Sequence, residues 1–345
     1  MLRAPHSLLF VLLPVACLVT TWTGADDFPV TSIPAKYRTD QACVHRNPTG
    51  RSSRGLGRRW MSIVRPRASR RRDSYQPVRL DPFYKKYVSA SGYPIVASER
   101  VNDYALKEAA FLVDQMLAQR PDVRRAMINS GSRLVVMAHD EYTTDIPEYA
   151  QFEPKDFWDA RARGLGGSED DPVCSAAEEN LLGFPGDPYS AECILIHEFA
   201  HNIHLRGLVR VDRTFDYRLQ QAYEAAMTDG LWNGKYAAVN HYEYWAEGVQ
   251  SWFNNNRPPD HDHNHVDTRR ELIEYDPRLA RLCREVFRDT TLAYTRPATR
   301  LVAHLEGYDP AQAPTFRWPQ RLQAAQQEIR HKAIRRNQDA EAGNP

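Results

Sequence analysis

The chain has 345 residues, with 45 Lys plus Arg against 44 Asp plus Glu, 42% hydrophobic residues and 10% aromatic residues. These proportions exclude the collagen-like, disordered and coiled-coil classes and leave enough apolar side chains for a sizeable core. The longest apolar run, Ser7 to Val19, is shorter than the roughly 20 residues that cross a bilayer. The sequence therefore predicts a mainly soluble protein with no stable membrane span.

The first 25 residues have the layout of a secretory signal peptide. Arg3 precedes the apolar run, and Thr23-Gly24-Ala25 places small residues before a cut after Ala25. We therefore expect the mature chain to be secreted, extracellular or held in the cell envelope. The alternatives are an uncleaved membrane anchor, disfavoured by the short run, and a lipid anchor at Cys17, disfavoured because Pro14 stands where Leu is usual.

A basic stretch follows within residues 26–78. Between Arg46 and Arg72 there are ten arginines and no Lys, Asp or Glu, amid Gly, Ser and Pro without an apolar period. We expect residues 26–78 to be a disordered linker or a pro-segment, and removal of residues 26–74 to leave the catalytic region folded. A solvated tether, a pro-segment cleaved after Arg70 to Arg72 and an anion-binding arm are all open, and no specific nucleic-acid partner is expected.

Residues 79–319 have a globular texture and are expected to form the catalytic domain, followed by a polar C-terminal tail over 320–345. The apolar period predicts helices at 104–118, 191–205, 216–231, 241–253 and 277–287, with another helical turn opening at Pro121. The unbroken apolar run Arg133 to Ala138 predicts a buried strand, and Asn180 to Phe184 a shorter one. The expected fold class is α+β.

Four cysteines remain after removal of a signal peptide: Cys43, Cys174, Cys193 and Cys283. An exported protein lies in a compartment that permits disulfides, and four cysteines allow three pairings. The alternative for Cys193, which lies in an apolar segment, is a buried free thiol.

One pentapeptide, His197-Glu198-Phe199-Ala200-His201, fits the pattern H-E-x-x-H. Residues four apart lie one turn apart on one face of a helix, so both imidazoles can bind a single metal ion with Glu198 beside them. Zinc suits this set because neutral imidazole is a good ligand and a fourth position stays open to water. Glu198 can accept the proton of that water as it attacks a carbonyl. The sequence predicts one catalytic zinc ion.

The third ligand is less evident. His204 follows the pentapeptide, but the metzincin pattern requires Gly at that position. Downstream, Asn240 is typical of a helix N-cap, which places Glu243 in the first turn and Glu247 one turn later on the same face. Glu243 either closes a capping box with Asn240 or points into the site as an oxygen ligand.

These residues resemble the gluzincin zinc metallopeptidases of the anthrax lethal factor type, which include the bacterial Pro-Pro endopeptidases. The resemblance covers about residues 192–253 and depends on HEFAH, on EYWAE at Glu243 to Glu247, and on Tyr236 seven residues before Glu243. It implies a zincin-like fold, with a small sheet packed on the H-E-x-x-H helix and a mostly helical C-terminal lobe. It does not imply a preference for Pro-Pro bonds or the target of a toxin.

The resemblance also implies roles for the matching residues in a secreted zinc metalloendopeptidase that acts on peptides or proteins. His197, His201 and Glu243 would bind zinc, and Glu198 would be the general base. Tyr236 would donate a hydrogen bond to the oxyanion, and Glu247 would orient a zinc ligand without binding the metal itself.

Two other functions and a second histidine group stay open. The chain is alternatively an exported cell-envelope or binding protein with a structural zinc site, or a zinc amidase that acts on cell-wall peptides. Glu198 discriminates the first of these, because a closed structural site does not need a free carboxylate beside the metal. The alternating histidines His261, His263 and His265 form either a second metal site or a hydrogen-bonded loop near the zinc helix.

Overall fold

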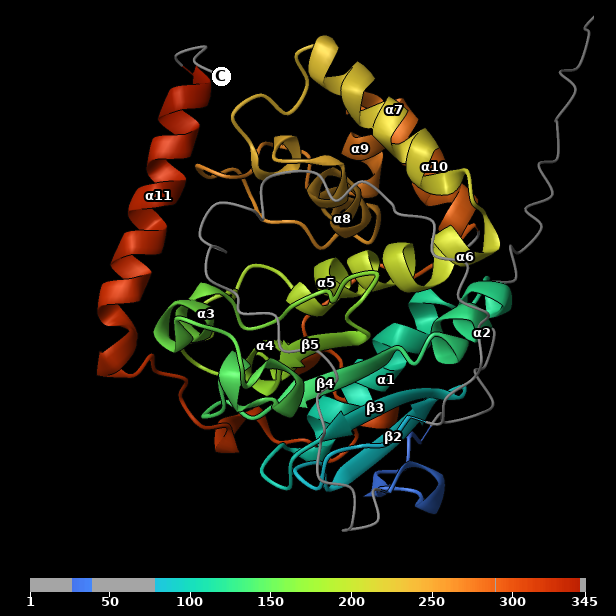
Figure 1. The fold of residues 1–345 in the computed structure, drawn as a ribbon, viewed down its shortest axis with the longest axis vertical. Helices are drawn as coiled ribbons and strands as arrows, with labels where there is room; N and C mark the ends of the chain where they lie inside the picture. The colour runs from blue at the N-terminus through green and yellow to red at the C-terminus, as the bar shows by residue number, and fades with distance from the viewer. Residues whose placement is uncertain (1–26, 39–77, 289, 342–345) are drawn as a thin grey trace, which may run out of the picture.

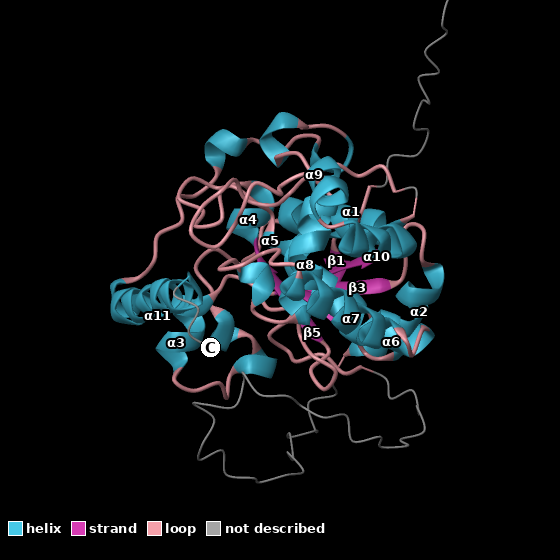
Figure 2. Ribbon diagram, turned by 90° about the horizontal axis from the view of Figure 1, so that it is seen from above, coloured by secondary structure: helices cyan, strands magenta, loops and turns pink. Residues whose placement is uncertain are grey.

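The structure is a computed structural model that describes residues 27–38, 78–288 and 290–341. The expected signal peptide, the arginine stretch from Arg46 to Arg72 and Cys43 lie outside these described residues. Within them, the fold is α+β, with a small mixed sheet in one layer and helices around it (Figures 1 and 2).

The sheet has five strands in the order β1-β2-β3-β4-β5. Its strands are β1 (Thr31–Ser32), β2 (Lys86–Ala90), β3 (Tyr93–Ala97), β4 (Arg133–Met137) and β5 (Val173–Ala177). β1, β2 and β3 pair antiparallel, whereas β3, β4 and β5 pair parallel. Beyond β5, Leu165 forms an antiparallel bridge with Ser175, so a short segment of the loop at 164–172 extends the sheet edge.

The predicted buried strand is confirmed at β4, and its unbroken apolar run has a structural cause. Leu134 and Val136 face the main core, whereas Val135 and Met137 face a second, smaller core on the other side of the sheet. A strand covered on both faces has no need of a polar alternate position.

The expectation of a second strand at Asn180 to Phe184 is wrong. These residues lie in and after α4 (Glu178–Leu182), a short helix that ends at Gly183 with a left-handed φ of 67°. All five residues of α4 are buried, so no polar face marks the helical period. A short apolar run of this kind cannot be assigned to helix or strand from periodicity alone.

The helices enclose the sheet and continue above it. Helices near the sheet are α1 (Asp103–Met116), α2 (Pro121–Asn129), α3 (Lys155–Arg161) and α5 (Ile194–Asn202). Farther along the chain are α6 (Val209–Val211), α7 (Phe215–Thr228), α8 (His241–Trp252), α9 (Arg269–Tyr275), α10 (Pro277–Phe287) and α11 (Gln323–Glu341). The five helices predicted from the apolar period are confirmed as α1, α5, α7, α8 and α10, with ends that differ by a few residues.

Helix α5 occupies the centre of the molecule, between the sheet below and α8 above (Figure 1). It continues without a break into a π-helical segment, Ile203–Leu208. The polar tail forms α11, which stands beside α3 at one side of the molecule in both views (Figures 1 and 2). None of the described helices is both long and apolar enough to cross a bilayer.

Residues 27–38 correct the expected boundary of the disordered linker. β1 pairs with β2, and Phe28, Ile33 and Tyr37 are buried in the two cores. The expectation that residues 26–78 contribute nothing to the fold is therefore wrong for residues 27–38. The three apolar side chains are irregularly spaced, so the sequence shows no helical or strand period there, although all three pack into the cores.

We expect Phe28→Ala to lower the free energy of unfolding by about 3 kcal/mol, the usual cost of removing a buried aromatic ring. Urea unfolding of the purified chain measures this loss. Ser32→Ala, at an exposed position of β1, is the control and should unfold as the wild type does. If Phe28→Ala unfolds at the wild-type urea concentration, the segment does not contribute to the core.

The described cysteines do not form a disulfide with one another. Cys174, Cys193 and Cys283 are free and buried in the main core. Burial raises the pKa of all three thiols, so they are apolar packing groups, as the alternative for Cys193 stated.

Candidate metal centre

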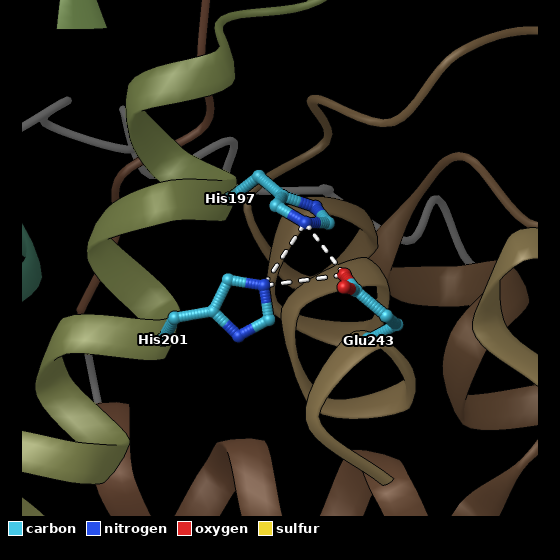
Figure 3. Close-up of side chains that lie close together, drawn as sticks. All are labelled: His197, His201 and Glu243. Carbon is cyan, nitrogen blue, oxygen red and sulfur yellow. Dashed lines mark hydrogen bonds and ion pairs between the residues drawn. The ribbon is translucent and has the colours of Figure 1, made fainter. Parts of the chain in front are cut away.

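The H-E-x-x-H segment forms the greater part of α5, which packs between β5 and α8. Leu195, Ile196, Phe199 and Ala200 are buried in the main core, whereas Glu198 is only half-buried. The apolar residues fix the rotation of the helix, because they must face the core. His197 and His201 are thereby directed toward α8, as Figure 3 shows.

Three side chains converge between α5 and α8 (Figure 3). The Nε2 atoms of His197 and His201 lie 3.1 and 3.2 Å from Glu243 Oε2 and 3.2 Å from each other. These donor atoms all lie within 4.8 Å of one another, so the group can hold a metal ion. Two imidazole nitrogens and one carboxylate oxygen form a donor set that suits zinc and leaves one tetrahedral position for water.

The start of α8 explains why Glu243 is available to this group. Asn240 is the N-cap, and its side-chain oxygen accepts hydrogen bonds from the backbone N–H groups of Tyr242 and Glu243, both at 2.9 Å. The Glu243 carboxylate is therefore not needed for capping and extends to the two imidazoles. Burial would raise the pKa of Glu243, but the neighbouring histidines lower it well below its usual value.

A glutamine that the sequence analysis missed, Gln250, contacts the ring nitrogen of His197 that faces away from the metal group. His197 Nδ1 lies 2.8 Å from Gln250 Oε1, whereas Glu247 Oε1 is farther away at 3.4 Å. A hydrogen bond from Nδ1–H to Gln250 leaves the Nε2 lone pair free for a metal, the usual arrangement behind a ligating histidine. Gln250 in turn donates to Glu192 Oε2 at 2.6 Å. The sequence feature that could have identified Gln250 is its spacing, because three residues after Glu247 it lies on the same face of α8.

Glu198 lies beside the metal group and has the properties of a proton acceptor. Burial raises the pKa of its carboxyl, while the charges of His197 and His201 lower it, and the pKa stays above its usual value. A carboxyl with a raised pKa holds a proton more readily near neutral pH, which suits a group that takes and returns one.

Two glycines let a loop pass directly over α5. A Cβ atom at Gly166 would lie 2.5 Å from His201 Cβ, and one at Gly164 would lie 3.1 Å from Glu198 Cγ. Only glycine permits so close an approach without moving the helix. The sheet edge at Leu165 is thereby held against α5, and the sequence analysis did not predict this role of the two glycines.

Tyr236 lies near His197, in a single 3₁₀ turn (Tyr236–Ala238) before α8. Its ring centre is 6.1 Å from that of His197, and its backbone N–H donates to the Asp262 carbonyl at 2.8 Å. Burial raises the pKa of the phenol well above its usual value, and the charge of Glu243 adds to this. The phenol therefore keeps its proton and can act as a hydrogen-bond donor.

His204 belongs to a separate cluster. It is fully buried, and its Nε2 lies 3.1 Å from Asp216 Oδ1 on α7, the same oxygen that lies 3.2 Å from His241 Nε2. The two neighbouring imidazoles, of which His241 is hydrogen-bonded to Asp216, lower the pKa of Asp216. The cluster links the π-helical segment, α7 and the start of α8, and so it holds together the helices that carry the metal group.

The three alternating histidines do not converge on one point. His261 is exposed and lies 2.9 Å from Asp262, whereas His265 is exposed and packs edge-on against the Tyr275 ring. His263 is buried and faces Glu247. Within the described residues the three form no metal group, so the structure does not support a second metal site here.

Comparison with known proteins gives little beyond this geometry. No protein-family profile and no curated protein sequence matches the chain. Among solved structures, the Pro-Pro endopeptidase from Paenibacillus alvei is similar, with a TM-score of 0.39 and 15% sequence identity. The similarity covers 56% of this chain and 97% of that protein. Similarity at this level does not establish a shared fold. The function of the chain is therefore inferred from the side chains of the metal group.

Proposed function

We propose that this chain is an exported zinc metalloendopeptidase of the gluzincin type with a zincin-like fold. The observation that carries the proposal is the position of Glu198, a half-buried carboxylate on α5 within reach of the charges of His197, His201 and Glu243. His197, His201 and Glu243 are the proposed zinc ligands. Export is inferred from the sequence of the first 25 residues alone.

Each residue around the metal group can have a separate role in peptide hydrolysis. When bound, zinc would supply a Lewis acid that lowers the pKa of a coordinated water and polarises a carbonyl. Glu198 accepts the proton of the attacking water and returns it to the leaving amine. The Tyr236 phenol donates to the oxyanion of the tetrahedral intermediate. Gln250 and Glu247 hold His197 so that Nε2 keeps its direction.

The two alternative functions predict different results. A structural zinc site is closed by four protein ligands, whereas the donor group of the described residues has three and a further carboxylate beside it. A zinc amidase acting on cell-wall peptides would use the same residues, so only the substrate can distinguish it from an endopeptidase.

The function is tested with the purified mature chain, a library of linear peptides and a set of cell-wall peptides. We expect cleavage of internal bonds in linear peptides, loss of this cleavage after zinc is removed by a chelator, and recovery on addition of zinc. Cleavage of cell-wall peptides alone would identify the amidase. Tight zinc binding with no cleavage in either set would identify a structural zinc protein.

We expect one zinc ion per wild-type chain and a loss of most of this zinc in Glu243→Ala, because the carboxylate is a direct ligand. Glu247→Ala should lose less, since Glu247 only approaches His197 at 3.4 Å. Metal analysis after gel filtration measures both. If Glu247→Ala loses more zinc than Glu243→Ala, the assignment of the third ligand is wrong.

A further inference from the structure

The turn that contains the alternating histidines lies behind the candidate metal centre. His263 is 5% exposed, with Nδ1 2.8 Å from Asp260 Oδ1 and Nε2 3.5 Å from Glu247 Oε2. The other oxygen of Glu247, Oε1, lies 3.4 Å from His197 Nδ1. A series of contacts thus runs from the exposed Asp260 through the buried His263 and Glu247 to a proposed zinc ligand.

The backbone of this turn fixes the His263 ring. The His263 backbone N–H donates to Asp260 Oδ1 at 2.8 Å, and the Asp260 N–H donates to the His263 carbonyl at 3.1 Å. The preceding carbonyl in the turn, that of Asp262, accepts from the Tyr236 N–H. One turn therefore supports both His197, through Glu247, and Tyr236.

The charges explain why Glu247 needs His263. Glu247 is 3% exposed, and a buried carboxylate is costly unless a cation or several hydrogen bonds compensate it. Asn256 Nδ2 donates one hydrogen bond to Glu247 Oε2 at 3.0 Å. His197 does not supply a second one, because its Nδ1 is paired with Gln250. His263 is the imidazole placed beside this same oxygen, with Nε2 3.5 Å from Glu247 Oε2.

The two other cations at this turn have partners of their own, and Lys235 Nζ donates to the Asp260 carbonyl at 3.1 Å. Arg257 Nε lies 3.1 Å from Glu192 Oε1, and Arg257 Nη1 lies 3.6 Å from Asp260 Oδ2. Arg257 therefore pairs with Glu192 and Asp260, and among the described residues no ion pair joins it to Glu247.

We propose that His263 is a positioning residue of the zinc site. It holds the Glu247 carboxylate turned toward His197, and it thereby strengthens zinc binding without touching the metal or a substrate. This inference rests on the proposed function, because it assumes that His197 binds zinc.

Zinc affinity of the full mature chain, measured by competition with a chromophoric chelator, tests the role of His263 directly. We expect His263→Leu to weaken zinc binding about 10-fold, within the range found for residues that orient metal ligands. His263→Gln keeps a donor for Glu247 and should weaken it less. His265→Ala, two residues away and exposed, is the matched control and should bind zinc as the wild type does. Wild-type affinity in His263→Leu would overturn the proposal.

A double-mutant cycle separates positioning from general destabilisation. If His263 acts through Glu247, His263→Leu should change zinc affinity less than about twofold in a Glu247→Gln background, because the coupled partner is gone. An equal loss in both backgrounds would show that His263 is merely structural. If His263→Leu does not fold, as judged by thermal unfolding of the zinc-free chain, the same cycle with His263→Gln decides.

The measurement needs no substrate, so its failure differs from failure of the proposed function. A wild-type chain that binds zinc and cleaves nothing would refute the peptidase and leave the role of His263 to be decided by the cycle. A wild-type chain with no zinc affinity would refute both.

Discussion

Glu198→Gln is expected to lower kcat/KM for peptide cleavage at least about 1000-fold, equivalent to about 4 kcal/mol of transition-state stabilisation. The amide has nearly the same size and shape as the carboxylate, but it cannot accept the proton of the attacking water. Glu198 is not one of the three converging donors, so zinc content should stay at one ion per chain. Thermal unfolding should also stay near that of the wild type.

Two further variants make this result specific. Glu198→Asp keeps the charge but withdraws the carboxylate by one methylene, and it should retain more activity than Glu198→Gln. Glu224→Gln, on the exposed face of α7, is the matched control and should cleave peptides at the wild-type rate. Full activity in Glu198→Gln would exclude the proposed mechanism, whatever the zinc content.

The helices were predictable from the sequence where they are long and apolar on one side. The periods of α1, α5, α7, α8 and α10 extend over several turns, which is enough to separate a helix from a strand. The hairpin of β2 and β3 was missed, although Ser91 and Gly92 form its turn with φ of 48° and 92°. Pro94 inside β3 weakens the strand signal, and β1 is too short to have a period.

The site could be predicted where its residues are close in sequence. Helical spacing alone brings His197 and His201 together, and the Asn240 cap explains the placement of Glu243. Gln250 lies on a predicted helix, but nothing in the sequence shows which residue it faces. The loop glycines reach the site only through tertiary packing, for which a single sequence holds no signal. His263 lies in the loop that the sequence analysis offered as a neighbour of the zinc helix, but its contact with Glu247 was not predicted.

Tyr236→Phe is expected to lower kcat about 100-fold with KM little changed, the typical cost of removing one oxyanion donor. The Tyr236 ring lies 6.1 Å from the His197 ring, and its backbone is anchored to the Asp262 carbonyl. Phenylalanine keeps both of these relations, so zinc content and the midpoint of thermal unfolding should stay near wild type. The loss should therefore appear only in the chemical step, where charge develops on the carbonyl oxygen.

Steady-state kinetics on a peptide from the library, run beside a zinc assay, measures this effect. Tyr242→Phe is the matched control, because its half-buried ring packs against His204 and His241 and not on the metal group. It should keep kcat within about twofold of the wild-type value. If Tyr236→Phe lowers kcat less than about threefold, Tyr236 is a packing residue. Its position seven residues before Glu243 then no longer supports the proposed function.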